Sequence, residues 1–256
     1  MMGSGGWKAG DGVTSYHQAL VYQMKYSANT DLAMILPIPT PIRSHPDAVK
    51  FHDLSNHNDF FQEMDDLFPV IPTLGMRGLK SYAMSDNDDD MLEVHDVGDY
   101  QASFVPHLDD FDRLDARFKL PREIWESIPD YSDYGFVVFK LKATPMLTRR
   151  GDQGKEVHPM AFVFENSSDL IFIPTMHIHD GQAPAIEEFD HSIYVQTQIE
   201  LPVTSVEYQT NTNYLLSKKR AKHGMKPNSL VDANDFIYRR RINGKHRNGD
   251  IHIPSK

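Results

Sequence analysis

Three neighbouring stretches decide the fold: GFVVFKLK at residues 135–142, VHPMAFVFE at 157–165 and LIFIPTMHIHD at 170–180. Each is a short apolar run rich in β-branched and aromatic residues, which is typical of strands with at least one buried face. The first two are joined by a polar loop that contains Gly151 and Gly154. Successive strands without a helix between them favour antiparallel pairing. This part of the chain therefore predicts an antiparallel sheet.

Further strands are predicted on both sides of these three. Gln18 to Tyr26 alternates with a period of two, which indicates a half-buried strand, and Leu32 to Leu36 is an apolar run that we expect to stop at Pro37. Gly98 and Asp99 have the composition of a tight two-residue hairpin turn. The remaining predicted strands are Met91 to Val97, Tyr100 to Val105, His191 to Glu200 and Phe236 to Ile242.

Four short segments have the spacing or end signals of helices. They are Asn58 to Phe68, Leu108 to Phe118, Pro121 to Ile128 and Thr212 to His223. In the first of them Asn58 serves as the expected N-cap and Pro69 as the stop. Because strands outnumber helices and occur in adjacent runs, we predict an α+β fold: a largely antiparallel sheet, or sheets, with a few short helices packed on one side.

Composition divides the chain into five expected parts. Residues 1–15 form a flexible N-terminus, 16–84 an N-terminal α/β half, and 85–90 an acidic linker or loop. Residues 91–243 form a C-terminal α+β half, and 244–256 a basic, mobile tail. The acidic stretch lacks the glycine and spaced ligands of a calcium-binding loop, which favours a solvated connection.

Charge and composition exclude several classes of function. A net charge of −10 makes nucleic acid an unlikely partner, although basic residues gather near the C-terminus as a solvated face, a counter-charge or an anionic partner surface. The absence of cysteine excludes disulfides and thiolate chemistry, so any metal must be held by histidine and carboxylate. No apolar run is long enough for a membrane span or a signal peptide. We expect a cytoplasmic protein that does not bind membranes.

Several ordered segments resemble a family of bacterial proteins that is catalogued only as a domain of unknown function. Each is a strand with a proline or glycine at its end, and together they extend roughly from Tyr16 to Asp180. The segments are Leu36-Pro37-Ile38-Pro39-Thr40-Pro41, Val97-Gly98-Asp99-Tyr100, Tyr134-Gly135-Phe136 with Lys140-Leu141, His158-Pro159-Met160-Ala161-Phe162, and Ile173-Pro174. The resemblance implies a shared fold and supplies no activity or functional residues. Members of that family are often exported, whereas this sequence shows no signal peptide.

The stretch from Pro174 to Gly181 carries the candidate site. If the strand continues past Pro174, His177 and His179 point to one face, about 6.5 Å apart, and two imidazoles at that separation can converge on one metal. Asp180 lies at the strand end, where a bend could bring its carboxylate to the pair. His191 begins the next predicted strand and would fall near His179 in a hairpin. The predicted ligands of a divalent metal, iron or zinc, are therefore His177, His179, Asp180 and His191.

Other interpretations of these histidines stay open. With 13 histidines in the chain, a His-x-His pair can be solvated or structural, and a His–Asp pair can act in acid/base chemistry without metal. His158 shares a face with Met160 and Phe162 and is expected at the rim of a buried surface. The sequence contains no phosphate loop, dinucleotide-binding turn or nucleophile elbow.

Two functions follow from these observations. The first, which we favour, is a non-enzymatic binding or accessory protein that holds a peptide or small ligand on a sheet edge or groove, because strand addition requires little more than an open edge. The second is a metal-dependent enzyme, a hydrolase or a non-haem iron oxygenase, centred on His177 and His179. Neither the ligand nor the oligomeric state follows from the sequence.

Overall fold

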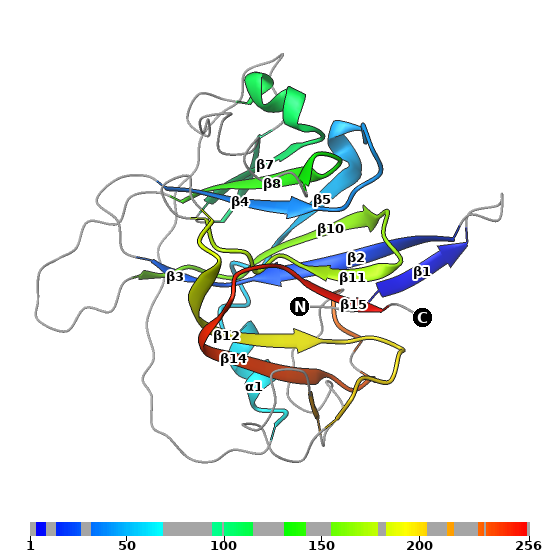
Figure 1. Ribbon diagram of the computed structural model, residues 1–256, viewed down its shortest axis with the longest axis vertical. Coiled ribbons are helices and arrows are strands. Elements are labelled where there is room, and N and C mark those ends of the chain that lie inside the picture. The colour runs from blue at the N-terminus through cyan, green and yellow to red at the C-terminus, as the bar shows by residue number, and fades with distance from the viewer. Residues whose placement is uncertain are drawn as a thin grey trace, which may run out of the picture.

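The structure is a computed structural model and describes residues 4–8, 14–26, 32–68, 94–98, 100–114, 131–141, 155–178, 183–203, 214–217, 230–232 and 234–254. These residues form antiparallel sheets that are stacked in layers (Figure 1). In order, the central sheet contains β1 (Ser4–Lys8), β2 (Thr14–Tyr22), β10 (Met160–Asn166) and β5 (Val49–Asp53). Figure 1 shows β4, β8 and β7 above the central sheet and the β12–β14 pair below it.

The central sheet is buried on both faces because its strands are apolar on both faces. Leu20, Phe162 and Phe164 point to one side and are almost inaccessible to solvent, at 3%, 0% and 0% exposure. Ala19 and Val21 point to the other side, into a different cluster of buried residues. The strand predicted to be half-buried is thus buried on both sides at its centre. Each large apolar side chain hidden in this way contributes roughly 1.5–3 kcal/mol.

A second sheet packs on the first face to form a sandwich. It contains β4 (Leu32–Ile38), β8 (Gly135–Leu141), β7 (Tyr100–Val105) and β6 (Val94–Val97), in that order. The hairpin predicted at Gly98-Asp99 is confirmed, because Val97 pairs with Tyr100. Strand β4 does not stop at Pro37, which pairs with Phe136. As the edge strand of this sheet, β4 tolerates a residue without an N–H group.

The other face of the central sheet packs on a third group of elements. Strands β12 (Ile186–Val195), β14 (Tyr238–Arg247) and β13 (Leu215–Leu216) form one sheet, and helix α1 (Phe60–Asp65) shares a buried cluster with it. Two further pairs are β11 (Leu170–Ile173) with β15 (Ile251–Pro254) and β3 (Lys25–Tyr26) with β9 (Lys155–Glu156). The 3-10 helices η1 (Pro46–Ala48) and η2 (Leu108–Arg113) complete the described elements.

The predicted α+β class is wrong, because the described residues are mostly antiparallel strand and the protein is closer to all-β. The helix predicted from Leu108 is a short 3-10 turn that ends in extended backbone at Leu114. Residues 215–216, predicted to be helical, pair with β14 instead. In both places the apolar residues pack on a sheet without forming the predicted α-helix, since tertiary contacts override a weak local preference. Residues 121–128 lie outside the described residues.

The single α-helix of the described part begins at Phe60, two residues after the expected Asn58 cap, and is six residues long. None of the helices in the described ranges could span a membrane.

The expected division into halves also looks different in the structure. Strands from both sides of residues 85–90 pair with each other, β2 with β10 and β4 with β8, so the two halves share sheets. The acidic stretch itself lies outside the described residues.

The tail predicted to be mobile after Gly244 instead forms the end of β14 and the whole of β15. The N-terminal segment predicted to be flexible contains β1, which pairs with β2.

Gly98 provides a test of the sandwich. Its φ of +62° lies in the left-handed region, and a Cβ atom placed there would come within 2.2 Å of His158 Nε2. We expect Gly98→Ala to lower the free energy of unfolding by roughly 2–4 kcal/mol, measured by urea denaturation. The control is Gly249→Ala, whose Cβ would meet nothing within 4 Å. Equal stability of the two variants would contradict this packing.

A charged cluster joins α1 to the third sheet. The Asp65 carboxylate accepts hydrogen bonds from the Tyr194 hydroxyl at 2.6 Å and from Arg239 at 2.5 Å. Arg239 is only 5% exposed and also lies over the Phe68 ring, 4.4 Å from its centroid. Burial and the hydrogen bond to Asp65 both raise the pKa of Tyr194. The Asp65 carboxylate is therefore the counter-charge that lets a guanidinium sit in the interior.

Removal of this counter-charge should be costly. We expect Asp65→Ala to lower the free energy of unfolding by roughly 2–4 kcal/mol, because the Arg239 guanidinium stays buried without its carboxylate. The neighbouring Asp66 is exposed and accepts only a surface hydrogen bond from Gln62. Asp66→Ala should therefore change stability by less than about 0.5 kcal/mol in the same denaturation experiment. A similar loss in both variants would show that the cluster is not a structural centre.

Candidate functional site

The structure places two of the four predicted ligands. His177 lies in the segment that follows β11, and His191 lies in the middle of β12. His179 and Asp180 lie outside the described residues, so their part in a site stays a prediction. The expected strand does not continue past Pro174: β11 ends at Ile173, and residues 174–178 form neither strand nor helix.

The turn between β14 and β15 holds the segment that carries His177. The Asn248 side chain accepts from the His177 N–H at 2.8 Å and donates to the His177 carbonyl at 2.7 Å, as a neighbouring strand would. Asp250 accepts from the backbone N–H groups of Thr175 and Met176, at 2.8 and 2.9 Å. Asp250 also accepts a hydrogen bond from the Tyr131 hydroxyl. Two side chains of one tight turn therefore fix the backbone position of His177.

His177 and His191 are in direct contact. Their Nε2 atoms are 3.3 Å apart and share one hydrogen bond, in which one imidazole donates and the other accepts. The hairpin predicted between the two histidine-bearing strands does not exist, because β11 pairs with β15 and β12 pairs with β14. His191 on β12 therefore meets His177 because the segment after β11 packs against β12, and not through strand pairing. Both residues are partly exposed, although the Nδ1 atom of His191 is buried and has no hydrogen-bond partner among the described residues.

The Phe189 ring forms one wall of this histidine pair. Its centroid lies 4.7 Å from that of His177 and 5.3 Å from that of His191. Gly244, which faces Phe189 across the sheet with a φ of +85°, leaves space on that side. His246 lies further away, with its ring 6.2 Å from Phe189 and its Nε2 at 2.8 Å from the Asn243 carbonyl oxygen. The pair therefore has an aromatic side and a side open to solvent.

The environment disfavours a proton on His191. Burial lowers the pKa of His191 below its ordinary value, the adjacent His177 imidazole lowers it further, and Asp190 opposes both effects. A neutral imidazole keeps a lone pair available at neutral pH, as both metal binding and hydrogen-bond acceptance require. The described residues contain no cluster of three or more histidine, aspartate or glutamate side chains that could hold a metal ion. The pair is consequently the part of the predicted site that the structure assembles.

His158 is more buried than predicted. It is 5% exposed, stacks on the Tyr100 ring at 4.7 Å between centroids, and places Nδ1 at 3.0 Å from the Pro159 carbonyl oxygen. It belongs to the sandwich core and not to the histidine pair.

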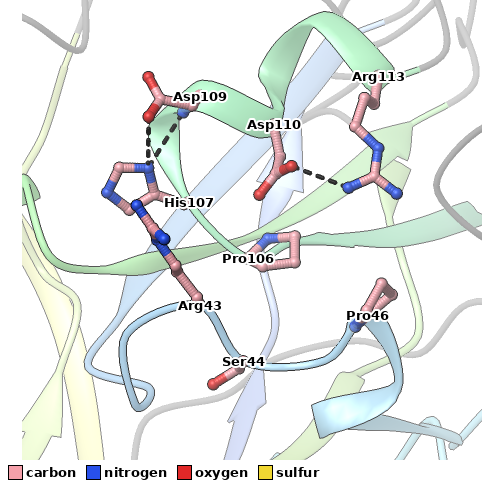
Figure 2. Close-up of a pocket in the computed structure, with 8 residues that line it drawn as sticks. All are labelled: Arg43, Ser44, Pro46, Pro106, His107, Asp109, Asp110 and Arg113. Atoms are coloured by element: carbon pink, nitrogen blue, oxygen red, sulfur yellow. Dashed lines mark hydrogen bonds and ion pairs between the residues drawn. The ribbon is translucent and has the colours of Figure 1, made fainter.

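A concave site that no sequence pattern indicated lies between residues 43–46 and residues 106–113. The cleft encloses about 390 Å³ beside η2, and Figure 2 shows the residues that line it: Arg43, Ser44, Pro46, Pro106, His107, Asp109, Asp110 and Arg113. Arg113 donates to Asp110 at 2.8 Å, and the His107 ring lies 3.3 Å from Asp109. Arg43 has a φ of +58°, a strained conformation for a residue with a side chain. Four of the lining residues thus form two ion pairs or hydrogen bonds within the cleft itself.

Sequence reasoning missed the residues that support the pair. Phe189 could not be assigned to it, because β12 was expected to begin at His191. Asn248-Gly249-Asp250 has the composition of a turn, so it could have been recognised as a hairpin between two strands. The contact of that turn with residues 175–177 is a tertiary feature without a local signal.

No family model matches the chain. A solved structure of a mutated baculovirus P35 after caspase cleavage is similar with 15% identity and a TM-score of 0.44, covering 94% of this chain and 95% of that one. A structure of baculovirus P35 is similar with 15% identity and a TM-score of 0.42, covering 99% of this chain and 95% of that one. Likeness at this level establishes neither a shared fold nor a shared function.

The lowered pKa of His191 predicts an effect of pH on stability. The unfolded chain, with an ordinary value near 6.5, binds this proton more tightly than the folded protein does. The neutral His191 imidazole therefore contributes to stability at pH values above the pKa of the unfolded chain. This contribution is lost as the pH falls through that pKa towards the lower pKa of the folded protein. We expect the loss of stability between pH 7.5 and 5.5, measured by urea denaturation, to be smaller in His191→Gln than in the wild type. The exposed His17 provides the control, and His17→Gln should keep the wild-type pH dependence.

If His191→Gln and the wild type lose stability equally on acidification, the imidazole is not held neutral by its surroundings.

Proposed function

We propose that the protein is a non-enzymatic binding protein that takes up an extended, basic peptide along the outer edge of β12. One observation carries this proposal. All ten residues of β12 pair with β14 on one side, and β12 pairs with no second strand among the residues that the structure describes. An edge of this length presents a row of backbone N–H and C=O groups that can form a ladder with an added strand.

The side chains of β12 favour a positively charged peptide. Glu188 and Asp190 are exposed on one face of the strand, with the 59% exposed Ile186 beside them. The side chains of an added strand would lie about 5 Å from these carboxylates. The basic residues on the same face that are at least partly exposed, Arg241, Lys245 and Arg247 on β14, would lie one strand further away, at about 10 Å. That distance is close to the Debye length at physiological salt, so their repulsion is screened more strongly than the nearby attraction.

The same charges disfavour pairing of this edge with a second copy of itself. Acidic residues on an edge strand repel the identical strand of another molecule, which protects the sheet from aggregation. A basic strand reverses this repulsion. Charge thus favours a different partner over self-association.

A metal-dependent enzyme is the second function that the sequence suggested. Among its nominated ligands, His177 and His191 are in contact, and His179 and Asp180 lie outside the described residues. The 3.3 Å separation of the two Nε2 atoms supports metal binding, but no described group beside the pair supports a particular reaction.

The test uses three fluorescein-labelled ten-residue peptides. Their valine and threonine residues alternate with lysine in the first peptide, with glutamate in the second and with glutamine in the third. We expect fluorescence anisotropy to show micromolar binding of the lysine peptide and binding at least about tenfold weaker for the other two. In the double variant Glu188→Lys, Asp190→Lys, affinity for the lysine peptide should fall at least about tenfold.

The matched control reverses two exposed carboxylates away from β12. Asp112→Lys, Asp133→Lys changes the net charge by the same amount, and both residues are exposed. It should bind the lysine peptide as the wild type does. Weak binding of all three peptides, or an equal loss in both double variants, would rule out the edge of β12 as the binding site.

A further inference from the structure

The contact between His177 and His191 has the dimensions of a chelate. Two nitrogen ligands on one tetrahedral metal, each about 2.1 Å from it, are about 3.4 Å apart. The two Nε2 atoms are separated by 3.3 Å. The nitrogens therefore already have the separation that a metal requires, and no backbone movement is needed to bring them together.

The ring orientations are compatible with this use. The ring planes are inclined by 38°, with centroids 5.1 Å apart, so the rings are neither stacked nor parallel. In the hydrogen bond the two nitrogens point at one another, whereas on a metal their lone pairs converge at a point beside the line that joins them. Rotation about the soft terminal torsion of each side chain is enough for this change.

The supporting contacts limit how far the pair can move. The His177 backbone is held on both its N–H and its C=O by Asn248, and His191 lies inside the long β12–β14 ladder. Phe189 contacts both rings. Ligands on a supported backbone lose little freedom when the metal binds, which favours affinity.

We propose that His177 and His191 form a two-histidine binding site for a divalent transition metal of the zinc class. Imidazole nitrogen suits zinc, nickel and copper, whereas magnesium and calcium prefer oxygen ligands. Water completes the coordination on the solvent side, since both residues are partly exposed. The hydrogen that the two nitrogens share moves to the Nδ1 atom of its own ring, so one histidine changes tautomer and neither changes charge.

This site is independent of the proposed peptide edge. His191 and Glu188 lie at odd and even positions of β12, so their side chains point to opposite faces of the sheet. A failure of peptide binding therefore leaves the metal site untouched, and the reverse also holds.

The experiment is titration of the metal-free full-length protein with Zn²⁺ by calorimetry at pH 7.5. It is repeated with Co²⁺, whose visible absorption reports nitrogen coordination, and with Mg²⁺ as the negative probe. The variants are His177→Gln and His191→Gln, which keep polar side chains in place. His246→Gln is the control, because His246 neighbours the same Phe189 ring and places its Nε2 beside the Asn243 carbonyl oxygen. Far-ultraviolet circular dichroism establishes that each variant is folded.

We expect wild-type protein and His246→Gln to bind one equivalent of Zn²⁺ with the same affinity. Each of the two pair variants should bind at this site at least about tenfold more weakly and should lose the Co²⁺ absorption. Wild-type affinity should also fall between pH 7.5 and 5.5, as protons compete for the imidazoles. Absence of Zn²⁺ binding in the wild type, or unchanged binding in both folded pair variants, would overturn the proposal.

Discussion

Both faces of the central sheet are buried, and the arrangement of the other elements depends on this. Leu20 and Phe162 pack into the sandwich on one side, while Ala19 and Ala161 pack towards α1 on the other. A buried polar side chain in a sheet that is covered on both sides needs hydrogen-bond partners, and Gln18 finds them on β11. Its buried side-chain amide donates to the carbonyl of Phe172 and accepts from the N–H of the same residue, which joins β2 to β11. Because β11 pairs with β15, this contact also fixes the turn that holds His177.

The β12–β14 pair combines two surfaces of different chemistry on one ladder. One face carries Phe189 and His191, which meet His177 and continue into a buried cluster with Ile193. The opposite face carries exposed carboxylates near the edge at which β12 has no partner among the described residues. Alternation of side chains along a strand makes this separation unavoidable, so a metal on one face and a peptide on the edge would not compete for the same side chains.

The sequence allowed the local features of the fold to be predicted, but not the long-range pairings. The hairpin at Gly98 and the apolar character of β8 and β10 follow from turn chemistry and periodicity. The end of β11 at Ile173 was missed because Pro174 was treated as an interruption within the strand, whereas the backbone after it is held by the side chains of Asn248 and Asp250 and not by a strand partner. Strand β15 was missed because its few residues have a partner only in β11, far away in the sequence. His177 and His191 were both predicted as ligands of one metal site. Their contact, however, depends on Asn248, which no local pattern connects to them.

A long-range ¹H–¹⁵N NMR spectrum of the histidine rings at pH 7.5 tests the contact between His177 and His191 directly. One hydrogen shared between two Nε2 atoms requires complementary tautomers. We expect one of the two rings to carry its proton at Nε2 and the other at Nδ1, and we expect His191→Gln to shift the ring resonances of His177. Rapid tautomer averaging in both rings, with His177 unaffected by His191→Gln, would contradict this contact.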